Sequence, residues 1–188
     1  PNDDITAYLS TSIMSITDGQ IILDLGAFRQ GIRPAVNAGL SVSRVGGQAQ
    51  TVRQKRLSGT LFKLLSKYKQ AEEFSHFGSS LSKDAQIDLT LGKQIYAALQ
   101  QPPETLYNLV EQQLLLETIL LGGGTVEIDI VGLKDAVIKA KSRVKAEKDF
   151  DHIEAELLKA HTIKSKTPTT IVVETPAEPP KEEANAKS

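Results

Sequence analysis

The chain contains 188 residues, 40% of them hydrophobic, which suffices for one ordinary buried core or two small ones. Its 22 basic and 23 acidic residues give a net charge of -1 at pH 7, which excludes a long-range field that would draw the whole chain to nucleic acid or to an anionic membrane. Cysteine is absent, so disulfides, thiolate zinc sites and a cysteine nucleophile are excluded.

Short apolar and β-branched runs, separated by turn residues, make up the first fifty residues. Three of these runs are predicted to be strands: residues 11–16 (TSIMSI), 20–25 (QIILDL) and 39–44 (GLSVSR). Residues 28–37 have the glycine and proline density of an ordered loop. Because two or three short strands without a covering layer are marginal in water, we expect this segment to need packing partners from outside the chain.

From about Thr51 the apolar residues recur at the three-and-four spacing of amphipathic helices. The first predicted helix carries its apolar stripe at Leu57, Leu61, Leu64, Leu65, Tyr68, Ala71 and Phe74. The second begins after Ser82, a favourable N-cap residue, and has to stop before a pair of prolines. A third is predicted over residues 107–121, where three consecutive glycines terminate it.

A fourth, highly charged helix is predicted to run to about Ala160. Its apolar positions are Leu133, Val137, Val144, Phe150, Ile153 and Leu157. From His161 onward the composition shifts to Lys, Thr, Glu and Pro, which predicts a solvated, disordered tail. Within this tail, residues 169–174 (TTIVVE) form an apolar run that could pair with a sheet edge.

Common chemical motifs are missing from the sequence. It contains neither the phosphate-binding loop G-x-x-x-x-G-K-[ST] nor a G-x-G-x-x-G turn after a strand. Its histidines lie far apart without metal-ligand spacing, which favours surface or hydrogen-bonded roles for them. The cluster of Arg53, Lys55 and Arg56 could touch phosphate, but a basic, solvated helix face is the favoured interpretation.

Arg44 has an unusual setting, between the small residues Ser41 and Ser43 and the pair Gly46 and Gly47. Small residues allow close approach of backbones, so an arginine there can be presented rigidly to an oxyanion. Phosphoryl transfer uses such an arginine in trans, where it neutralises charge that develops at the γ-phosphate. A surface arginine at a strand end is the alternative, and residue spacing leaves both interpretations open.

Three stretches of the sequence resemble the α subunit of the F-type ATP synthase. They are residues 12–23 (SIMSITDGQIIL), 31–50 (GIRPAVNAGLSVSRVGGQAQ) and 72–83 (EEFSHFGSSLSK). The resemblance is close over residues 4–99, weaker to Leu121 and poor beyond it. It implies an α/β fragment made of the C-terminal strands of a RecA-like nucleotide-binding domain (residues 1–50), an all-α helical bundle domain (51–160) and a disordered tail (161–188).

The resemblance also implies a function at a subunit interface. In this family ATP forms or breaks at α–β interfaces of an α3β3 hexamer, where the β subunit holds the phosphates and α contributes an arginine. Arg44 matches that arginine, and Ser15 and Gly19 match positions that line the same interface. The chain would then be one component of a rotary, proton-translocating enzyme and inactive alone.

A second, non-catalytic nucleotide site is implied on the α subunit itself. Arg33 and Pro34 match an Arg-Pro pair near the adenine, and Gln101 matches one of two glutamines there. Pro103 stands where the family often has the second glutamine. The implied ligands are ATP or ADP with Mg²⁺, whose phosphate and metal ligands we expect on the N-terminal part of α and on β.

The resemblance lacks the family's N-terminal β-barrel and phosphate loop. We therefore expect a split or proteolytically cut α subunit, partnered by an N-terminal α fragment, β and the central and peripheral stalks. The expected location is the matrix side of the mitochondrial inner membrane, peripheral to the membrane, with a bacterial plasma membrane or thylakoid as alternatives. A free-standing helical scaffold or regulatory protein is the rival hypothesis; a nucleic-acid module around Arg53 is disfavoured by the neutral charge and the lack of aromatic platforms.

Overall fold

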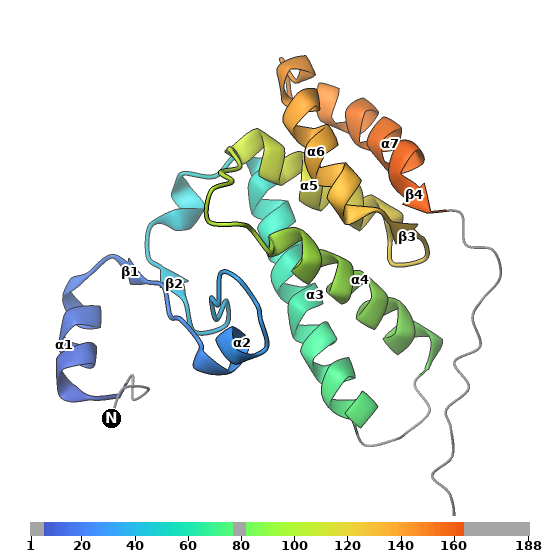
Figure 1. The fold of residues 1–188 in the computed structure, drawn as a ribbon. Coiled ribbons are helices and arrows are strands. Elements are labelled where there is room, and N and C mark those ends of the chain that lie inside the picture. The colour runs from blue at the N-terminus through green and yellow to red at the C-terminus, as the bar shows by residue number, and fades with distance from the viewer. Residues whose placement is uncertain (1–5, 77–81, 164–188) are drawn as a thin grey trace, which may run out of the picture.

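The computed structural model describes residues 6–76 and 82–163 of the chain (Figure 1). An N-terminal region, residues 6–51, contains short helices and strands and lies to one side of the long helix α3 (Val52–His76). A helical region, residues 52–76 and 82–163, packs longer helices around one apolar core. The predicted order of a short-stranded part followed by a helical bundle is confirmed, whereas most of the predicted tail lies outside the described residues.

The first predicted strand, residues 11–16, is instead part of helix α1 (Tyr8–Ile16). The prediction was wrong because it weighed β-branched residue types above spacing: Leu9, Ile13 and Ile16 recur at intervals of four and three, as on one helix face. The hydroxyl of Thr11 donates to the carbonyl of Ala7 (3.2 Å), a bond that suits threonine to a helix.

The other two predicted strands are present but short. β1 (Gly19–Gln20) and β2 (Val42–Ser43) pair antiparallel, with Gly19 opposite Ser43, and an isolated bridge joins Leu23 to Val36. Helix α2 (Leu25–Arg29) occupies the rest of the second predicted strand and the start of the predicted loop. A short 3-10 helix, η1 (Gly46–Gln48), leads toward the helical region.

Asp24 organises the segment between the two strands. Its carboxylate caps α2 by accepting from the backbone N–H of Ala27 (2.9 Å), and it also accepts from the side chain of Asn37 (3.1 Å). These hydrogen bonds lower the pKa of Asp24, so the cap stays ionised at neutral pH. The loop from Gly31 to Asn37 is thereby tied to the helix that precedes it.

The predicted helices α3, α4 (Lys83–Leu99) and α5 (Leu109–Gly122) are confirmed. Ser82 caps α4, as predicted, by accepting from the N–H of Ala85 (3.2 Å). Asn108 and Glu111 form a reciprocal capping box at the start of α5. At its end Gly123 adopts the left-handed conformation (φ 60°) that favours glycine. Among the described residues, no helix is both long and apolar enough to span a bilayer.

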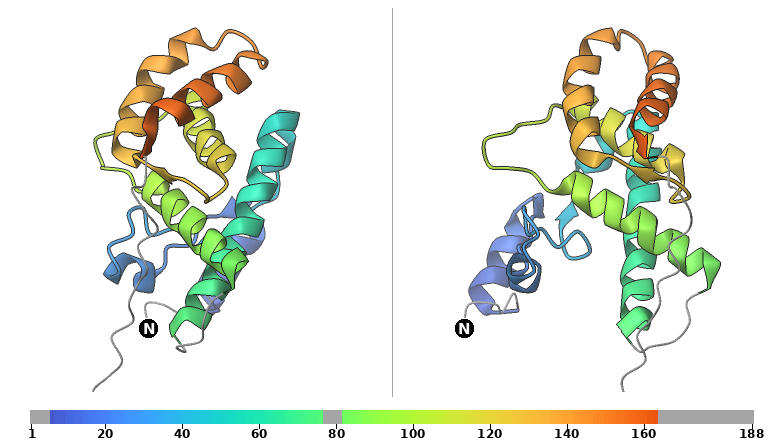
Figure 2. Two further views of the ribbon diagram at one scale, coloured as in Figure 1. Left: turned by 90° about the vertical axis from the view of Figure 1, so that its right-hand side faces the viewer. Right: turned by 45° about the vertical axis from the view of Figure 1, so that its right-hand side comes forward.

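Helices α3 and α4 cross at close range (Figure 2). A Cβ atom on Gly92 of α4 would overlap the ring of Tyr68 on α3, so glycine permits this approach. Further along the bundle, the most deeply buried hydrophobic side chains, each 0% exposed, come from α4, α5 and α6. They are Ile95, Leu114, Ile119, Leu133 and Val137.

The predicted fourth helix is in fact two helices that lie side by side over α5 (Figure 2). α6 (Ile130–Ala140) runs into the 3-10 helix η2 (Lys141–Arg143), and α7 (Asp149–His161) follows after a turn. The carboxylate of Asp149 accepts from the N–H groups of Lys145 (2.9 Å) and Ala146 (2.8 Å), which stabilises the turn without glycine or proline. Two strands that the sequence analysis did not predict, β3 (Glu127–Ile128) and β4 (Thr162–Ile163), pair antiparallel, so residues 161–163, which were assigned to the tail, are part of α7 and β4.

Candidate functional sites

Arg44 follows strand β2 and is held against the end of α1. Its backbone N–H donates to the carbonyl of Asp18 (2.9 Å), and its guanidinium donates to the carbonyls of Met14 (3.3 Å) and Ser15 (3.4 Å). These last two carbonyls belong to the final turn of α1, where no following turn pairs them and the helix dipole is negative. The Arg44 side chain is exposed and carries five N–H donors, so it can also meet an anionic group from outside.

The structure brings the other two residues predicted for this site next to Arg44. Ser15 supplies one of the carbonyls that the guanidinium binds. Gly19 lies opposite Ser43 in the β1–β2 ladder, one residue before Arg44. A Cβ atom on Gly19 would overlap the carbonyl oxygen of Val42, so only glycine lets the two strands approach at this point.

Arg33 is folded back onto its own loop. Its guanidinium carbon lies 3.7 Å from the ring centroid of Phe28, and Nη1 donates to the carbonyls of Phe28 (2.7 Å) and Ile32 (3.1 Å). The carbonyl of Arg33 accepts from the backbone N–H of Gln101 (3.0 Å). Arg33, Pro34 and Gln101, predicted for the second site, are therefore neighbours, and a hydrogen bond between the two regions joins them.

A cavity of about 410 Å³ opens beside this contact, between the N-terminal region and helices α3 and α4. Pro34 forms part of its wall, whereas Arg33 and Gln101 lie next to it. The cavity is lined by Ile32, Pro34, Val36, Ala38, Gly39, Phe62, Leu65, Ser66, Lys69, Tyr96, Leu99 and Gln100. A mainly apolar wall with a few polar groups is typical of a pocket for a small organic ligand.

Two tyrosines pack where α3 and α4 meet, and one of them, Tyr96, also lines this cavity. The ring centroids of Tyr68 and Tyr96 are 5.2 Å apart, and the Tyr68 hydroxyl donates to Glu72 (2.8 Å). Burial and the Glu72 carboxylate raise the pKa of both tyrosines. Both hydroxyls therefore stay protonated and can donate hydrogen bonds at physiological pH.

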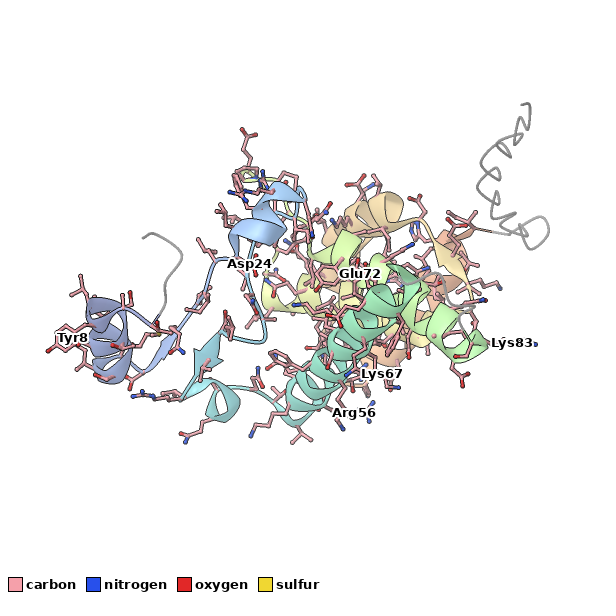
Figure 3. All side chains as sticks on the ribbon, turned by 90° about the horizontal axis from the view of Figure 1, so that it is seen from below. Tyr8, Asp24, Arg56, Lys67, Glu72 and Lys83 are labelled. Carbon is pink, nitrogen blue, oxygen red and sulfur yellow. The ribbon has the colours of Figure 1, made fainter. Side chains whose placement is uncertain are left out.

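The prediction of a basic, solvated helix face is wrong for Arg53. Its side chain is only 15% exposed and points into the helical region, whereas Arg56, one turn further along α3, extends into solvent (Figure 3). The sequence could not indicate that Arg53 is buried, because its hydrogen-bond partners lie 64 to 101 residues away in the sequence. Lys55 is exposed, as predicted.

An acidic cluster from two other helices surrounds the Arg53 guanidinium. The guanidinium donates to Glu117 of α5 (2.7 Å) and to Asp151 and Glu154 of α7 (both 2.8 Å). Burial and the nearby Glu117 carboxylate raise the pKa of Glu154 to about 8, although Arg53 opposes the shift. This cluster joins α3, α5 and α7; among the described residues, no group of three or more His, Cys, Asp or Glu side chains is placed to hold a metal ion.

Lys134 is a second residue that sequence reasoning missed. From α6, its ammonium donates to the carbonyls of Ala97 (2.8 Å) and Gln100 (2.5 Å) at the end of α4. Burial lowers the pKa of this ammonium. A lysine 34 residues away from Gln100 carries no local signal of such a contact, so only the tertiary structure reveals it.

Two family models match the chain in consecutive blocks. The ATP synthase alpha/beta chain, C terminal domain, matches residues 50–172, and the ATP synthase alpha/beta family, nucleotide-binding domain, matches residues 1–43. The first of these models alone covers more than half of the chain. The chain belongs to the ATP synthase alpha/beta family. Ser15, Gly19, Arg33 and Pro34 thus fall in the part that matches the nucleotide-binding domain, Gln101 in the C-terminal domain, and Arg44 between the two matches.

Curated relatives within this family carry the name ATP synthase subunit alpha. The protein from Lactiplantibacillus plantarum is 45% identical over 119 residues, 63% of this chain and 24% of that protein. The protein from Petrotoga mobilis is 46% identical over 110 residues (58% and 22%), and that from Frankia alni 43% over 132 residues (70% and 23%). The resemblance to the α subunit is confirmed, and the chain spans about a quarter of the length of these relatives.

A solved structure supports the fold of this family member. It is that of a unique ATP synthase subunit, NeqB, from Nanoarcheaum equitans. The two structures superpose with a TM-score of 0.62 at 22% sequence identity, over 66% of this chain and 32% of that one. At this identity the likeness establishes a shared fold.

Proposed function

We propose that the chain serves as part of the α subunit of a proton-translocating F-type ATP synthase and that Arg44 is its arginine finger. In this proposal Arg44 reaches across an α–β interface to a nucleotide whose phosphates a β subunit holds. The observation that carries the proposal is the setting of Arg44: it is exposed, yet its backbone and guanidinium are both hydrogen-bonded to residues 14–18. An arginine held in this way loses little conformational entropy when it meets a phosphate.

The chemistry that such an arginine supplies is electrostatic. Phosphoryl transfer spreads negative charge over the oxygens of the transferred group, and a guanidinium aimed at them stabilises the transition state. Ser15 and Gly19 have supporting roles in the proposal: the Ser15 carbonyl orients the guanidinium, and Gly19 lets strand β2 lie close enough to deliver it. Magnesium bound with the nucleotide would neutralise further phosphate charge, with its ligands outside this chain.

The second element of the proposal is a non-catalytic nucleotide site around Arg33, Pro34 and Gln101. It is supported by the hydrogen bond between Arg33 and Gln101 and by the adjacent cavity, whose apolar wall suits a planar base such as adenine. Pro103, where the family often has a second glutamine, offers no side-chain hydrogen bond to a base. We therefore expect fewer polar contacts to adenine here than in the family at large.

The wider assembly is also part of the proposal. The chain would join β and the stalk subunits in an α3β3 complex, peripheral to the membrane and inactive when isolated. We divide it at residue 50 into a nucleotide-binding part and a C-terminal helical domain, a division supported by the start of α3 at Val52 and by the family models that meet between residues 43 and 50. The mitochondrial location stays a prediction, and the three relatives described above are bacterial.

Replacement of Arg44 in the assembled complex tests the proposal. For Arg44→Ala and Arg44→Lys we expect ATP turnover to fall by about 10³-fold or more, because the charge developing on the phosphoryl group loses its partner or its bidentate geometry. Nucleotide affinity of the β subunit should stay within a few-fold of wild type, since β holds the phosphates. Steady-state hydrolysis and equilibrium nucleotide binding measure the two effects separately.

A matched control is Arg56→Ala, which removes an exposed arginine from α3 (Figure 3). This variant should hydrolyse ATP at the wild-type rate. Near-normal turnover of both Arg44 variants would end the arginine-finger assignment.

A further inference from the structure

The ammonium of Lys134 closes the C-terminal end of helix α4. The last carbonyls of any helix lack intrahelical partners and carry the negative end of the helix dipole, so a cation there is favourable. Lys134 reaches from α6 to two of these carbonyls, those of Ala97 and Gln100. Both contacts described for its ammonium are thus with the backbone of α4 and depend on where that helix stops.

The residue after this helix end contacts the proposed nucleotide site directly. Gln100 is the C-cap of α4, and its backbone turns from helical to extended there (ψ 128°). The next residue, Gln101, donates its backbone N–H to the carbonyl of Arg33 (3.0 Å), immediately before Pro34. Two hydrogen bonds from the Lys134 ammonium to the end of α4, and one from the following residue Gln101 to Arg33, therefore link α6 to the Arg33 loop.

The same helix end borders the cavity. Gln100 and Leu99 line it from the side of α4, opposite Pro34 of the N-terminal region. A change in where α4 ends would shift this wall and weaken the Gln101 hydrogen bond at the same time. Gln100 consequently ends the helix, lines the cavity and directly precedes the residue that contacts the N-terminal region.

We infer that Lys134 is a positioning residue for the nucleotide site at Arg33, Pro34 and Gln101, which it holds in place by fixing the end of α4. This inference rests on the proposed non-catalytic site. Lys134 does not itself line the cavity; it acts through Gln100, which lines the cavity and whose carbonyl accepts from the Lys134 ammonium. A merely stabilising cap would affect unfolding without any selective effect on the nucleotide bound there.

The test measures the release of radiolabelled ATP from the non-catalytic sites of the assembled complex, together with KM at the catalytic sites and the thermal midpoint. Lys134→Met keeps the apolar stem and removes the donor; we expect release about ten times faster, with KM unchanged. Lys134→Arg restores a cation of similar reach and should recover much of the slow release. Lys139→Met, which removes an exposed lysine from the same helix, should behave as wild type.

Two further variants separate this inference from the proposed site itself. Arg33→Ala removes the arginine at the site, and Gln101→Pro removes the N–H that Arg33 accepts. If both variants speed release while Lys134→Met does not, the positioning role is overturned and the site stands. If neither affects release, the site itself is refuted, and the positioning role with it. Fast release from Lys134→Met that Lys134→Arg fails to slow would also contradict the mechanism.

Discussion

The N-terminal region and the helical region achieve order by different means. In the helical region, apolar side chains from five helices, α3 to α7, are excluded from water around one core. In the described part of the N-terminal region, Ala35 is the only buried hydrophobic residue, and backbone hydrogen bonds and the Asp24 cap hold the segment together. Tyr8 is 87% exposed and points away from the rest of the chain (Figure 3).

This difference indicates which region packs within the chain and which offers a surface to other proteins. Large apolar side chains that face solvent together are typical of a surface that packs against another protein. Exposed examples in the N-terminal region include Leu9, Ile16, Ile21, Leu23 and Phe28. The helical region supplies stability within the chain, whereas the N-terminal region carries the residues proposed to act between subunits.

The largest effect in the helical region is expected for Arg53→Met. The variant leaves the buried carboxylate of Glu117 without its cation and the buried carboxyl group of Glu154 without its hydrogen-bond donor, which should lower the free energy of unfolding by about 3–5 kcal/mol. Urea unfolding followed by circular dichroism measures the loss. Arg56→Met is the matched control on the same helix, where an exposed side chain should matter by less than about 0.5 kcal/mol. Equal losses for the two variants would show that the Arg53 cluster stabilises nothing.

The same residue type in the two regions gives a direct comparison. Ile119 is 0% exposed and Ile13 is 50% exposed. Ile119→Ala opens a cavity in the core and should cost about 2–5 kcal/mol, whereas Ile13→Ala should cost less than about 0.5 kcal/mol in the isolated chain. Thermal unfolding of the two variants checks this. A comparable loss at Ile13 would mean that the N-terminal region shares the stability of the core and would break the distinction drawn above.

The smallest effect, per pH unit, is the pH dependence of stability that Glu154 causes. Its pKa is raised from 4.5 to about 8 in the folded chain, so between these values the folded state binds a proton that the unfolded state has released. The stabilisation is therefore complete below about pH 4.5 and is lost as pH rises toward 8, with a slope of at most about 1.4 kcal/mol per pH unit.

Glu154→Gln removes this titration and keeps an oxygen that can accept from Arg53. Urea unfolding of both proteins at pH 6 and pH 8 should show a greater loss of stability for wild type than for the variant. Parallel pH profiles would mean that Glu154 is already ionised at pH 6. A steeper profile for wild type would distinguish Glu154 from Asp24 in the N-terminal region, whose pKa is lowered and whose carboxylate stays charged.

Local rules predicted much of the fold. They failed where local signals conflicted, as in α1, or where a turn lacked glycine and proline, as between α6 and α7. The apolar stripe of α3, the Ser82 cap of α4 and the glycines at the end of α5 were sufficient because each of these signals acts within a few residues. α1 was missed because β-branched residues outweighed a short helical spacing. α6 and α7 were merged because the turn between them depends on the Asp149 carboxylate rather than on glycine or proline.

The candidate sites divide in a similar way. Resemblance led to Arg44, Ser15 and Gly19, and to Arg33, Pro34 and Gln101, and each set proves to be spatially clustered. Their roles remain predictions, since proximity alone does not establish chemistry. The contacts of Arg53 and Lys134 could not be predicted, because each joins helices far apart in the sequence and depends on how those helices pack.

The ion pairs that hold Arg53 in the helical bundle affect how the chain can move at Arg44. Arg53 lies in the first turn of α3, anchored to α5 and α7, and follows Arg44 by only nine residues. The connector between them contains Gly46 and Gly47 in the short helix η1. Any rotation of the helical bundle relative to the N-terminal region must be absorbed by this short connector or be transmitted to the strand that carries Arg44. The helical region is thus the rigid part, the short connector is the place where the chain can bend, and Arg44 lies directly before that connector.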